Sequence, residues 1–305
     1  MSNYWRKREL ENIKKMLRDD KKLARRLARN KKRAMEEIEK QIEAFYGRYA
    51  LKEGLTMDEA RRRVAKTNVE QYRSKAKRYV KEKNFTQRAN EEMRLYNVTM
   101  RINRLELLKA NLHLELVAMT SEEERILFDE MSKMARAEFK RQAGLLGISL
   151  KYNEKMIKDI INSSFLNATW SDRIWNNQDG LRAELDRLLN RGIVQGLNPR
   201  ELARELRKRF NVNTYDSERL LRTEMARVQS DVFEETANQA GFEAYEFIAE
   251  PDACNECSNL DGKVFPLKER GVGINFPPVH PHCRCATANA MSKDEWEREM
   301  KRRGL

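Results

Sequence analysis

Two cysteine pairs lie close together in this sequence. All four cysteines of the 305-residue chain fall in the stretch CNECSNLDGKVFPLKERGVGINFPPVHPHCRC, which begins at Cys254. Cys254 and Cys257 form a C-x-x-C pair, a spacing at which one turn of chain aims two thiolates at one ion. Cys283 and Cys285 form a C-x-C pair, and residues two apart on an extended chain point the same way. The two pairs can therefore meet at one tetrahedral Zn²⁺ ion.

Two histidines in the same stretch supply alternative ligands. His280 and His282 precede the second cysteine pair, so six candidates compete for four positions around a metal. Four sulfurs, or three sulfurs and one imidazole, would complete the site. A catalytic zinc keeps one position open for water, whereas abundant thiolates favour a closed structural site. The spacing therefore predicts a structural zinc; reduced unliganded thiols, a disulfide pair and a catalytic thiol are the alternatives.

The segment that carries these residues differs in composition from the rest of the chain. After Gly241 the string FEAYEFIAE alternates aromatic and polar residues, which predicts a strand. Asp261 and Gly262 predict a tight turn with a positive φ at the glycine, followed by a short strand. A module of about 50 residues rarely buries enough surface to be stable alone, so a metal would stabilise it. Arg284 lies between two ligand candidates and is expected to point away from the metal.

The elements before this module are predicted to be helices. Apolar residues recur three or four apart in residues 31–52 and again from Thr86 to residue 119. Gly 12 and Pro 6 are low counts, which favours long helices over a turn-rich β fold. Further helix starts are predicted from capping residues at Thr56, Ser121, Asn153, Thr169 or Ser171, Asn198, and Asp216 or Ser217. We expect a mostly α fold, with long N-terminal helical hairpins or a bundle, a second helical region and a small C-terminal α+β zinc-ribbon-like module.

Composition sets the expected domains and compartment. Residues 1–150 are predicted to form a basic, elongated helical arm, 151–241 a second helical part, 242–290 the zinc-stapled module and 291–305 a charged tail.

Mean hydropathy is −0.84, and no run of about 18 apolar residues occurs, so no membrane span is expected. The first residues lack the apolar core of a secretory signal, which predicts a reducing compartment. His113, within the third predicted helix, is expected to carry no chemistry.

Positive charge is concentrated in two of the predicted helices. The net charge is +13, and residues 1–35 hold 14 Lys/Arg against 4 Asp/Glu, while residues 61–88 hold 11 against 2. Such blocks repel themselves unless a partner neutralises them, which favours contact with nucleic acid or an acidic protein surface over a merely solvated face. The candidate contact residues are Lys21, Lys22, Arg25, Arg26, Arg29, Lys31, Lys32, Arg33, Arg61, Arg62 and Arg63.

The cysteine motifs resemble those of a known family. The strings DACNECSNLDGKVF and PPVHPHCRC resemble the C-terminal module of the phage Mu F-like minor head proteins, which are head morphogenesis proteins of tailed phages and prophages. Upstream, LLRTEMARV, with Arg222 and Glu224, is similar to the Arg-Thr-Glu helix of that family. His282 falls at a variable position of the family pattern, which makes His280 the better ligand candidate. The resemblance covers about residues 165–290.

The resemblance implies a minor capsid protein rather than an enzyme. Its expected partners are the phage portal protein, the scaffold or major capsid protein, and packaged DNA, with no membrane and no small-molecule substrate. Its expected location is the virion head, and the host cytoplasm during assembly. Arg222 and Glu224 lie two apart on a helix and do not face each other, so we expect Arg222 or Glu224 to bond the loops of the zinc module rather than to catalyse.

Two other functions remain open from the residues alone. A metal-dependent nuclease could use His280 and His282 of the HPH segment together with Asn275, but cysteine-rich sites favour structural zinc over Mg²⁺. A cellular nucleic-acid-binding zinc-ribbon protein would need a basic C-terminal module, and this one has few basic or stacking residues.

Overall fold

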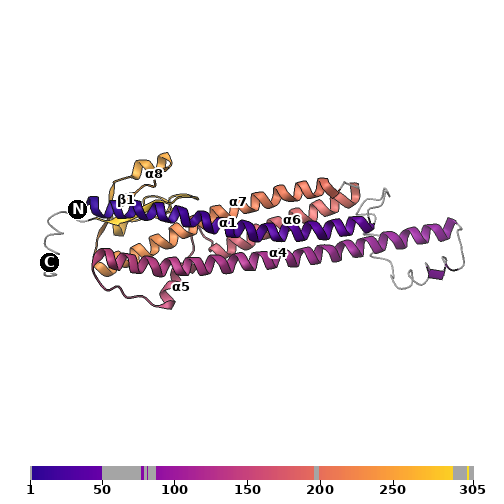
Figure 1. Cartoon of the computed structure of the whole chain (residues 1–305), viewed down its shortest axis with the longest axis horizontal. Coiled ribbons are helices and arrows are strands. Elements are labelled where there is room, and N and C mark those ends of the chain that lie inside the picture. Colours follow the sequence, from indigo (N-terminus) through magenta and orange to yellow (C-terminus); the bar gives the residue numbers. More distant parts are fainter. Residues whose placement is uncertain are drawn as a thin grey trace. The chain divides into compact units, whose positions relative to one another are not determined.

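Helices make up most of the described structure, as predicted. The computed structural model describes residues 2–49, 77–78, 81, 87–195, 199–290 and 301. The predicted Thr56 and Asn198 caps, Arg61, Arg62, Arg63 and most of the 291–305 tail lie outside these residues. The helices of the described ranges (Figure 1) are α1 (Ser2–Tyr49), α4 (Gln87–Leu146), α5 (Glu154–Asn162), α6 (Trp170–Gln195), α7 (Pro199–Ala240) and α8 (Asn255–Leu260).

A small antiparallel sheet follows α7. Its strands are β1 (Ala244–Ile248), β2 (Val264–Pro266) and β3 (Ala286–Asn289), in the order β2-β1-β3. Tyr245 in the central strand pairs with Phe265 on one side and with Asn289 on the other. The sequence predicted β1 and β2. It did not predict β3 or α8, because the string ATAN and the polar NECSNL carry neither a strand nor a helix pattern.

The described chain divides into two compact units, each assembled from separated segments. One unit comprises Met1–Asn30, Ser121–Asn176 and Thr214–Leu305, and the other comprises Lys31–Thr120 and Asn177–Asn213. The sequence, by contrast, was divided into consecutive segments with boundaries at 150, 241 and 290. The roles given to those segments stay predictions.

Each unit has its own apolar core. In the second unit, Ile38 and Ile42 of α1 pack with the predicted α4 stripe, which includes Leu105, Leu112 and Leu116. In the first unit, one cluster joins the four long helices and α5; its members include Leu27, Met131, Phe139, Ile161, Trp170 and Leu221. The stripes predicted from apolar periodicity therefore do form buried seams, within the residues whose side chains are described.

Two predicted helix starts were wrong. Ser121 and Glu124 lie inside α4, which runs without a break from Gln87 to Leu146, and Asp216 and Ser217 lie inside α7. Buried apolar residues continue on both sides of Ser121, from Met119 to Ile126. Packing of a continuous apolar face outweighs a local capping pattern when neither Gly nor Pro interrupts the helix.

Other local signals were confirmed. The Asn153 side chain accepts a hydrogen bond from the Met156 N–H at 2.8 Å and caps α5. Thr169 and Asp172 form a reciprocal cap at the start of α6, since the Asp172 N–H donates to Thr169 Oγ1 at 3.1 Å and the Thr169 N–H donates to Asp172 at 3.0 Å. Gly241 ends α7 at φ +76°, and Gly262 turns the chain at φ +74°.

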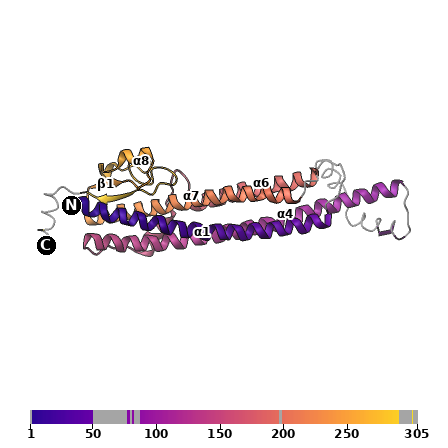
Figure 2. The ribbon, with the colours of Figure 1, turned by 45° about the horizontal axis from the view of Figure 1, so that its top comes forward.

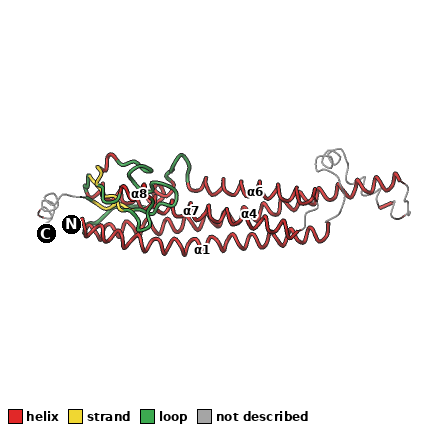
Figure 3. The backbone as a smooth tube through the Cα atoms, turned by 90° about the horizontal axis from the view of Figure 1, so that it is seen from above, coloured by secondary structure: helices red, strands yellow, loops and turns green. Residues whose placement is uncertain are grey.

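The sheet packs on the first unit's own helices. Trp5 and Ile13 of α1 and Phe233 of α7 share an apolar cluster with Tyr245 and Ala288 of the sheet. Figure 2 shows the strands and α8 beside the beginning of α1. Loops rather than regular elements make up most of the chain around the strands (Figure 3). These loops carry the cysteines and histidines.

Candidate metal centre

The first cysteine pair is positioned by α8. Cys254 is the N-cap residue of this helix, and Cys257 lies one turn later, so both sulfurs project from its first turn. Cys254 is exposed, whereas Cys257 is buried among Phe247 and the second cysteine pair. Leu260 and Phe265 pack against this cluster.

His280 faces the first cysteine pair. Its Nε2 atom lies 3.2 Å from Cys254 Sγ and 3.3 Å from Cys257 Sγ. Its Nδ1 atom lies 2.8 Å from the carbonyl oxygen of Pro281, which accepts a hydrogen bond from the ring. A carbonyl acceptor at Nδ1 leaves the lone pair on Nε2, the atom that points at the sulfurs. His280 therefore has the orientation and tautomer of a metal ligand.

The second cysteine pair meets Cys257 from the other side. Cys257 Sγ and Cys283 Sγ are 3.9 Å apart. Cys257, Cys283 and Cys285 form one triplet of ligand atoms within 4.8 Å of one another, and Cys254, Cys257 and His280 form another. Cys257 belongs to both triplets. The structure thus brings together all five predicted ligand residues around one sulfur.

The distances suit a tetrahedral metal with sulfur and nitrogen ligands. Bonds of about 2.3 Å to sulfur and about 2.0 Å to nitrogen place two sulfurs about 3.8 Å apart, and a sulfur and a nitrogen about 3.5 Å apart. The 3.9 Å and 3.2–3.3 Å separations lie close to those values. The cluster can therefore hold a metal ion, and its chemistry is compatible with zinc.

The protonation of the sulfurs is uneven. A backbone N–H from Cys257 lowers the pKa of the Cys254 thiol. The Cys257 sulfur lowers the pKa of Cys283, while hydrogen bonding to Cys283 raises the pKa of Cys257. A divalent cation bound here would replace the protons of these sulfurs with its own charge.

Arg222 and Thr223 hold the loop of the second cysteine pair; the sequence suggested this role for Arg222 but not for Thr223. The Arg222 guanidinium forms an ion pair with the buried Glu250, and Glu250 accepts the Arg284 backbone N–H at 3.0 Å. Thr223 Oγ1 accepts the His282 N–H at 3.0 Å. Two consecutive residues of α7 therefore fix the backbone on both sides of Cys283.

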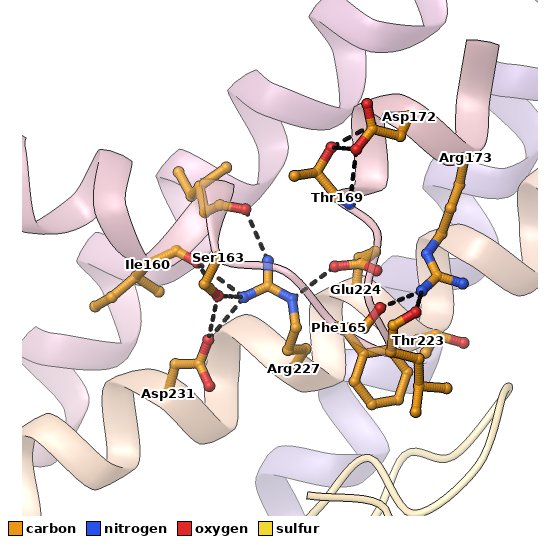
Figure 4. Close-up of polar contacts among 12 residues, drawn as sticks. Ile160, Ser163, Phe165, Thr169, Asp172, Arg173, Thr223, Glu224, Arg227 and Asp231 are labelled. Atoms are coloured by element: carbon orange, nitrogen blue, oxygen red, sulfur yellow. Dashed lines mark hydrogen bonds and ion pairs between the residues drawn. The ribbon is translucent and has the colours of Figure 1, made fainter. Parts of the chain in front are cut away.

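Glu224 acts through a residue that sequence reasoning missed. Arg227, one turn later on α7, is 2 % exposed and donates to Glu224 at 2.7 Å. The same guanidinium donates to the carbonyl oxygens of Ile160 and Ile161, both at 2.8 Å, and to Asp231 at 2.7 Å (Figure 4). It thus donates to two carbonyls in the last turn of α5, of which that of Ile160 also accepts from Ser163.

The side chain of Arg284 turns toward α1, consistent with the expectation that it points away from the ligands. It is 1 % exposed, and its Nε and Nη2 atoms donate to the two carboxylate oxygens of Asp20 at 3.0 and 3.2 Å. Gln229 accepts from Nη1 at 3.3 Å. No sequence pattern marks Asp20 or Gln229 as a partner of Arg284. Asp20, for example, is one acid among the many cations of α1.

The histidines outside the cluster are used structurally. The ring of His282 lies 5.5 Å from that of Tyr215, and His113 Nε2 lies 2.8 Å from Asp186. Asn275, which a nuclease would need beside the histidines, accepts from the Gly271 N–H at 2.6 Å and donates to the Glu269 carbonyl.

The basic candidates differ in exposure. Lys21, Lys22, Arg25 and Arg29 are exposed on α1, and Arg26 is half-buried beside Glu130. In the second unit, Lys32 and Arg33 are exposed. Lys31 differs from the prediction: it is 3 % exposed and donates to Asn213, so it offers no surface contact. A buried ammonium needs such a partner.

The fold and the site define a mostly helical protein with a small, cysteine-clustered α+β module. Residues 183–288, about a third of the chain, match the model of the family described as phage Mu protein F like protein. This match confirms the resemblance that the motifs predicted; the matched family is one of phage head morphogenesis proteins. No curated protein and no solved structure matches the chain. None of the helices in the described ranges carries an apolar stretch long enough to cross a bilayer.

Proposed function

We propose that the chain is a minor head protein that associates with the phage portal, contacts packaged DNA through α1 and is held together by one structural zinc. The observation that carries this proposal is the metal-ligand geometry around Cys257, which lies inside the segment that matches the Mu F-like family. Association with the portal follows from the family resemblance alone. Co-purification of the chain with the portal protein of the same phage tests that part.

The zinc is proposed to bind Cys254, Cys257, Cys283 and His280. His280 Nε2 contacts two of these sulfurs, and the third lies 3.9 Å from Cys257. Cys285 is buried beside them and would remain as a thiol next to the site. Binding free energy at such a site is folding free energy, on the order of 10 kcal/mol or more. The cysteine loops, whose own buried cluster contains Phe247 and three cysteines, would gain stability in this way.

The DNA contact is proposed for one face of α1. Nine cations of its first 30 residues are exposed, against one exposed acid, Glu11: Lys7, Arg8, Lys14, Lys15, Arg18, Lys21, Lys22, Arg25 and Arg29. At 100° per residue they fall within an arc of about 140°, opposite the buried face that includes Ile13, Leu23 and Leu27. We call this row the cationic strip. It runs about 33 Å along the helix.

The composition of the cationic strip favours a polyanion over a protein surface. Protein interfaces have an apolar or aromatic centre with a polar rim. Between residues 5 and 30, the described helix exposes no large apolar side chain; Tyr4, 52 % exposed, lies at its start. Phosphate contacts, in contrast, need only well-spaced Lys and Arg. Packaged DNA is the phosphate polymer that a head protein meets.

Salt dependence of DNA binding tests this contact. Affinity should fall steeply with salt, and Lys14→Ala/Lys21→Ala should reduce the log–log slope by about 2, because each phosphate contact contributes about one unit. Lys155→Ala/Lys158→Ala removes the same charge from the exposed face of α5 and should leave the slope nearly unchanged. Equal effects of the two double substitutions would show non-specific attraction and sink the proposed contact.

A further inference from the structure

Helix α4 exposes an apolar face within the second unit. Leu107 and Leu114 are 62 % and 68 % exposed, and Ala110 and Val117 are exposed on the same face. These four residues follow one another at intervals of three, four and three, which keeps them in one row along the helix. We call this row the α4 seam. It runs about 15 Å along the helix.

The α4 seam lies opposite the face that α4 buries. At 100° per residue, its centre lies about 180° from that of the buried stripe. That stripe consists of Leu105, Leu108, Leu112 and Leu116. A surface helix has one apolar stripe with a polar face opposite to it, whereas a helix that is apolar on both sides packs between two layers. The described residues of the second unit supply one of these layers.

The exposed part of this face carries no charge. Charged residues make up 36 % of the chain. From Leu107 to Ala118, however, every exposed position holds either an apolar residue or Asn111. A row of exposed apolar side chains marks a surface that another molecule covers, and depletion of charge is what distinguishes the centre of a protein interface. The α4 seam offers nothing to DNA, because phosphate contacts need cations or hydrogen-bond donors.

The spacing of the α4 seam fits a second helix, because side chains three and four apart insert between those of a facing helix. A second copy of α4 fits best when the two helices run antiparallel. Leu107 of each copy then faces Val117 of the other, and Leu114 faces Ala110. Each leucine thus meets a smaller residue, which allows dense packing. A parallel pair would place Ala110 against Ala110 and leave a void between the larger layers.

Charges at the edge of the α4 seam favour the same direction. Arg104 and Glu122 are five full turns of α4 apart, so they lie on one edge of the helix, beyond the two ends of the seam, and both are partly exposed. In an antiparallel pair like edges face each other, so Arg104 of each copy comes close to Glu122 of the other. Glu122 also binds Arg125 of its own helix at 2.7 Å, and a carboxylate can accept from two cations. Exposed pairs of this kind add little affinity, but they select one orientation.

We propose that the α4 seam is a self-association surface, on which α4 of a second copy docks antiparallel. About ten residues of each copy lie on this face, against about 20–30 in a standard interface, so the pair buries on the order of 700 Å² in total. That area supports a weak, exchanging association and not an obligate dimer. The inference goes beyond the proposed head-protein function and depends on neither the zinc nor the DNA contact.

Sedimentation velocity of the full chain measures the association. Between about 1 μM and about 300 μM, the weight-average mass should rise from that of one chain toward that of two. Leu114→Lys places a charge in the centre of the α4 seam and should keep the chain monomeric; because Leu114 is exposed, the fold should not change. Val212→Lys alters a similarly exposed apolar side chain of α7 in the same unit, and should associate like the unsubstituted chain. An unsubstituted chain that stays monomeric over the whole range, or equal effects of the two substitutions, would overturn the proposal.

Photo-cross-linking of the full chain tests the direction of the pair. Ala118→benzoylphenylalanine puts a photoreactive group at the exposed edge of the α4 seam, where an antiparallel copy presents its residues 105–109. A parallel copy would present residues 110–125 there, and trypsin separates the two peptides because it cuts after Arg104, Lys109 and Arg125. Links to 110–125 of the other copy would overturn the antiparallel docking.

Isotope mixing shows whether the links join two copies. In an equimolar mixture of ¹⁴N- and ¹⁵N-labelled chains, links between peptides of unlike label should be as frequent as links between peptides of like label. Links confined to like labels would show that the chain covers its own α4 seam, and would overturn self-association.

Discussion

Arg284 lies between two cysteines of the candidate metal centre, yet its guanidinium is buried against Asp20 of α1, 264 residues away in the sequence. Two parallel hydrogen bonds, at 3.0 and 3.2 Å, join the groups. This pair ties the loop of the second cysteine pair to the first unit's own helix. Burial raises the pKa of Asp20, and the Arg284 charge opposes that rise.

Breaking this pair should destabilise the fold strongly. Asp20→Asn leaves a buried guanidinium without a counter-charge, which costs about 3–5 kcal/mol. Chemical unfolding followed by circular dichroism measures the loss. Glu154→Gln is the matched control, because it removes a carboxylate from the exposed pair with Arg136, and such pairs contribute little. Similar unfolding midpoints for the two variants would show that the buried pair stabilises the fold no more than the exposed pair does.

The ligand set of the zinc can be resolved one residue at a time. We expect about one zinc per chain by elemental mass spectrometry. His280→Ala and Cys283→Ser should weaken zinc binding more than about a hundredfold, beyond what a lost outer partner costs. Cys285→Ser should retain the metal. Retention in His280→Ala together with loss in Cys285→Ser would show four sulfur ligands instead.

The sequence indicated the candidate metal centre because its signal is local. Two cysteine pairs and one histidine lie within about 30 residues, and each spacing already restricts where the side chains point. What the sequence could not show is which residues brace them. Asp20, Thr223 and Glu250 reach the cysteine loops from α1, α7 and the end of β1. Their partners are set by tertiary packing, and no periodicity or spacing marks them.

The sequence predicted the presence of the long helices correctly, but it misplaced some of their ends. Periodic apolar residues identified the buried seams of α1 and α4, since burial of one face is what forms a long helix. Helix starts were wrongly predicted at Ser121 and Asp216. Serine and aspartate also occur within helices when their side chains bond to other side chains of the helix. Asp216, for example, pairs with Arg219 at 3.5 Å on α7.

Arg227 is expected to support α5 as well as α7. Arg227→Met removes the donor to Glu224, Asp231 and the carbonyls of Ile160 and Ile161, and should cost about 3–5 kcal/mol. Hydrogen exchange should accelerate first at the end of α5, where both carbonyls lose the Arg227 donor. Arg125→Met, which removes an exposed arginine of α4, is the control. Uniform acceleration across the helices would contradict the local role.

A buried carboxylate of α1 should make stability depend on pH. Glu9 is 2 % exposed and lies 2.8 Å from Arg141, with Glu138 nearby on α4. Burial raises the pKa of Glu9 to about 7; Arg141 opposes the rise and the Glu138 charge adds to it. An unfolded glutamate titrates near about 4.3. Between these values the folded chain holds a proton that the unfolded chain has lost.

The sign of the effect follows from that difference. Stability changes with pH in proportion to the protons bound when unfolded minus those bound when folded, and this quantity is negative between about pH 4.3 and 7. The contribution of Glu9 to the free energy of unfolding should thus decrease as pH rises through this window, by on the order of 4 kcal/mol. Glu9→Gln should flatten the curve there, as measured by urea unfolding at several pH values. Glu11→Gln changes an exposed carboxylate two residues away and should leave the slope unchanged; a Glu9→Gln curve as steep as the unsubstituted one would assign the pH dependence to other groups.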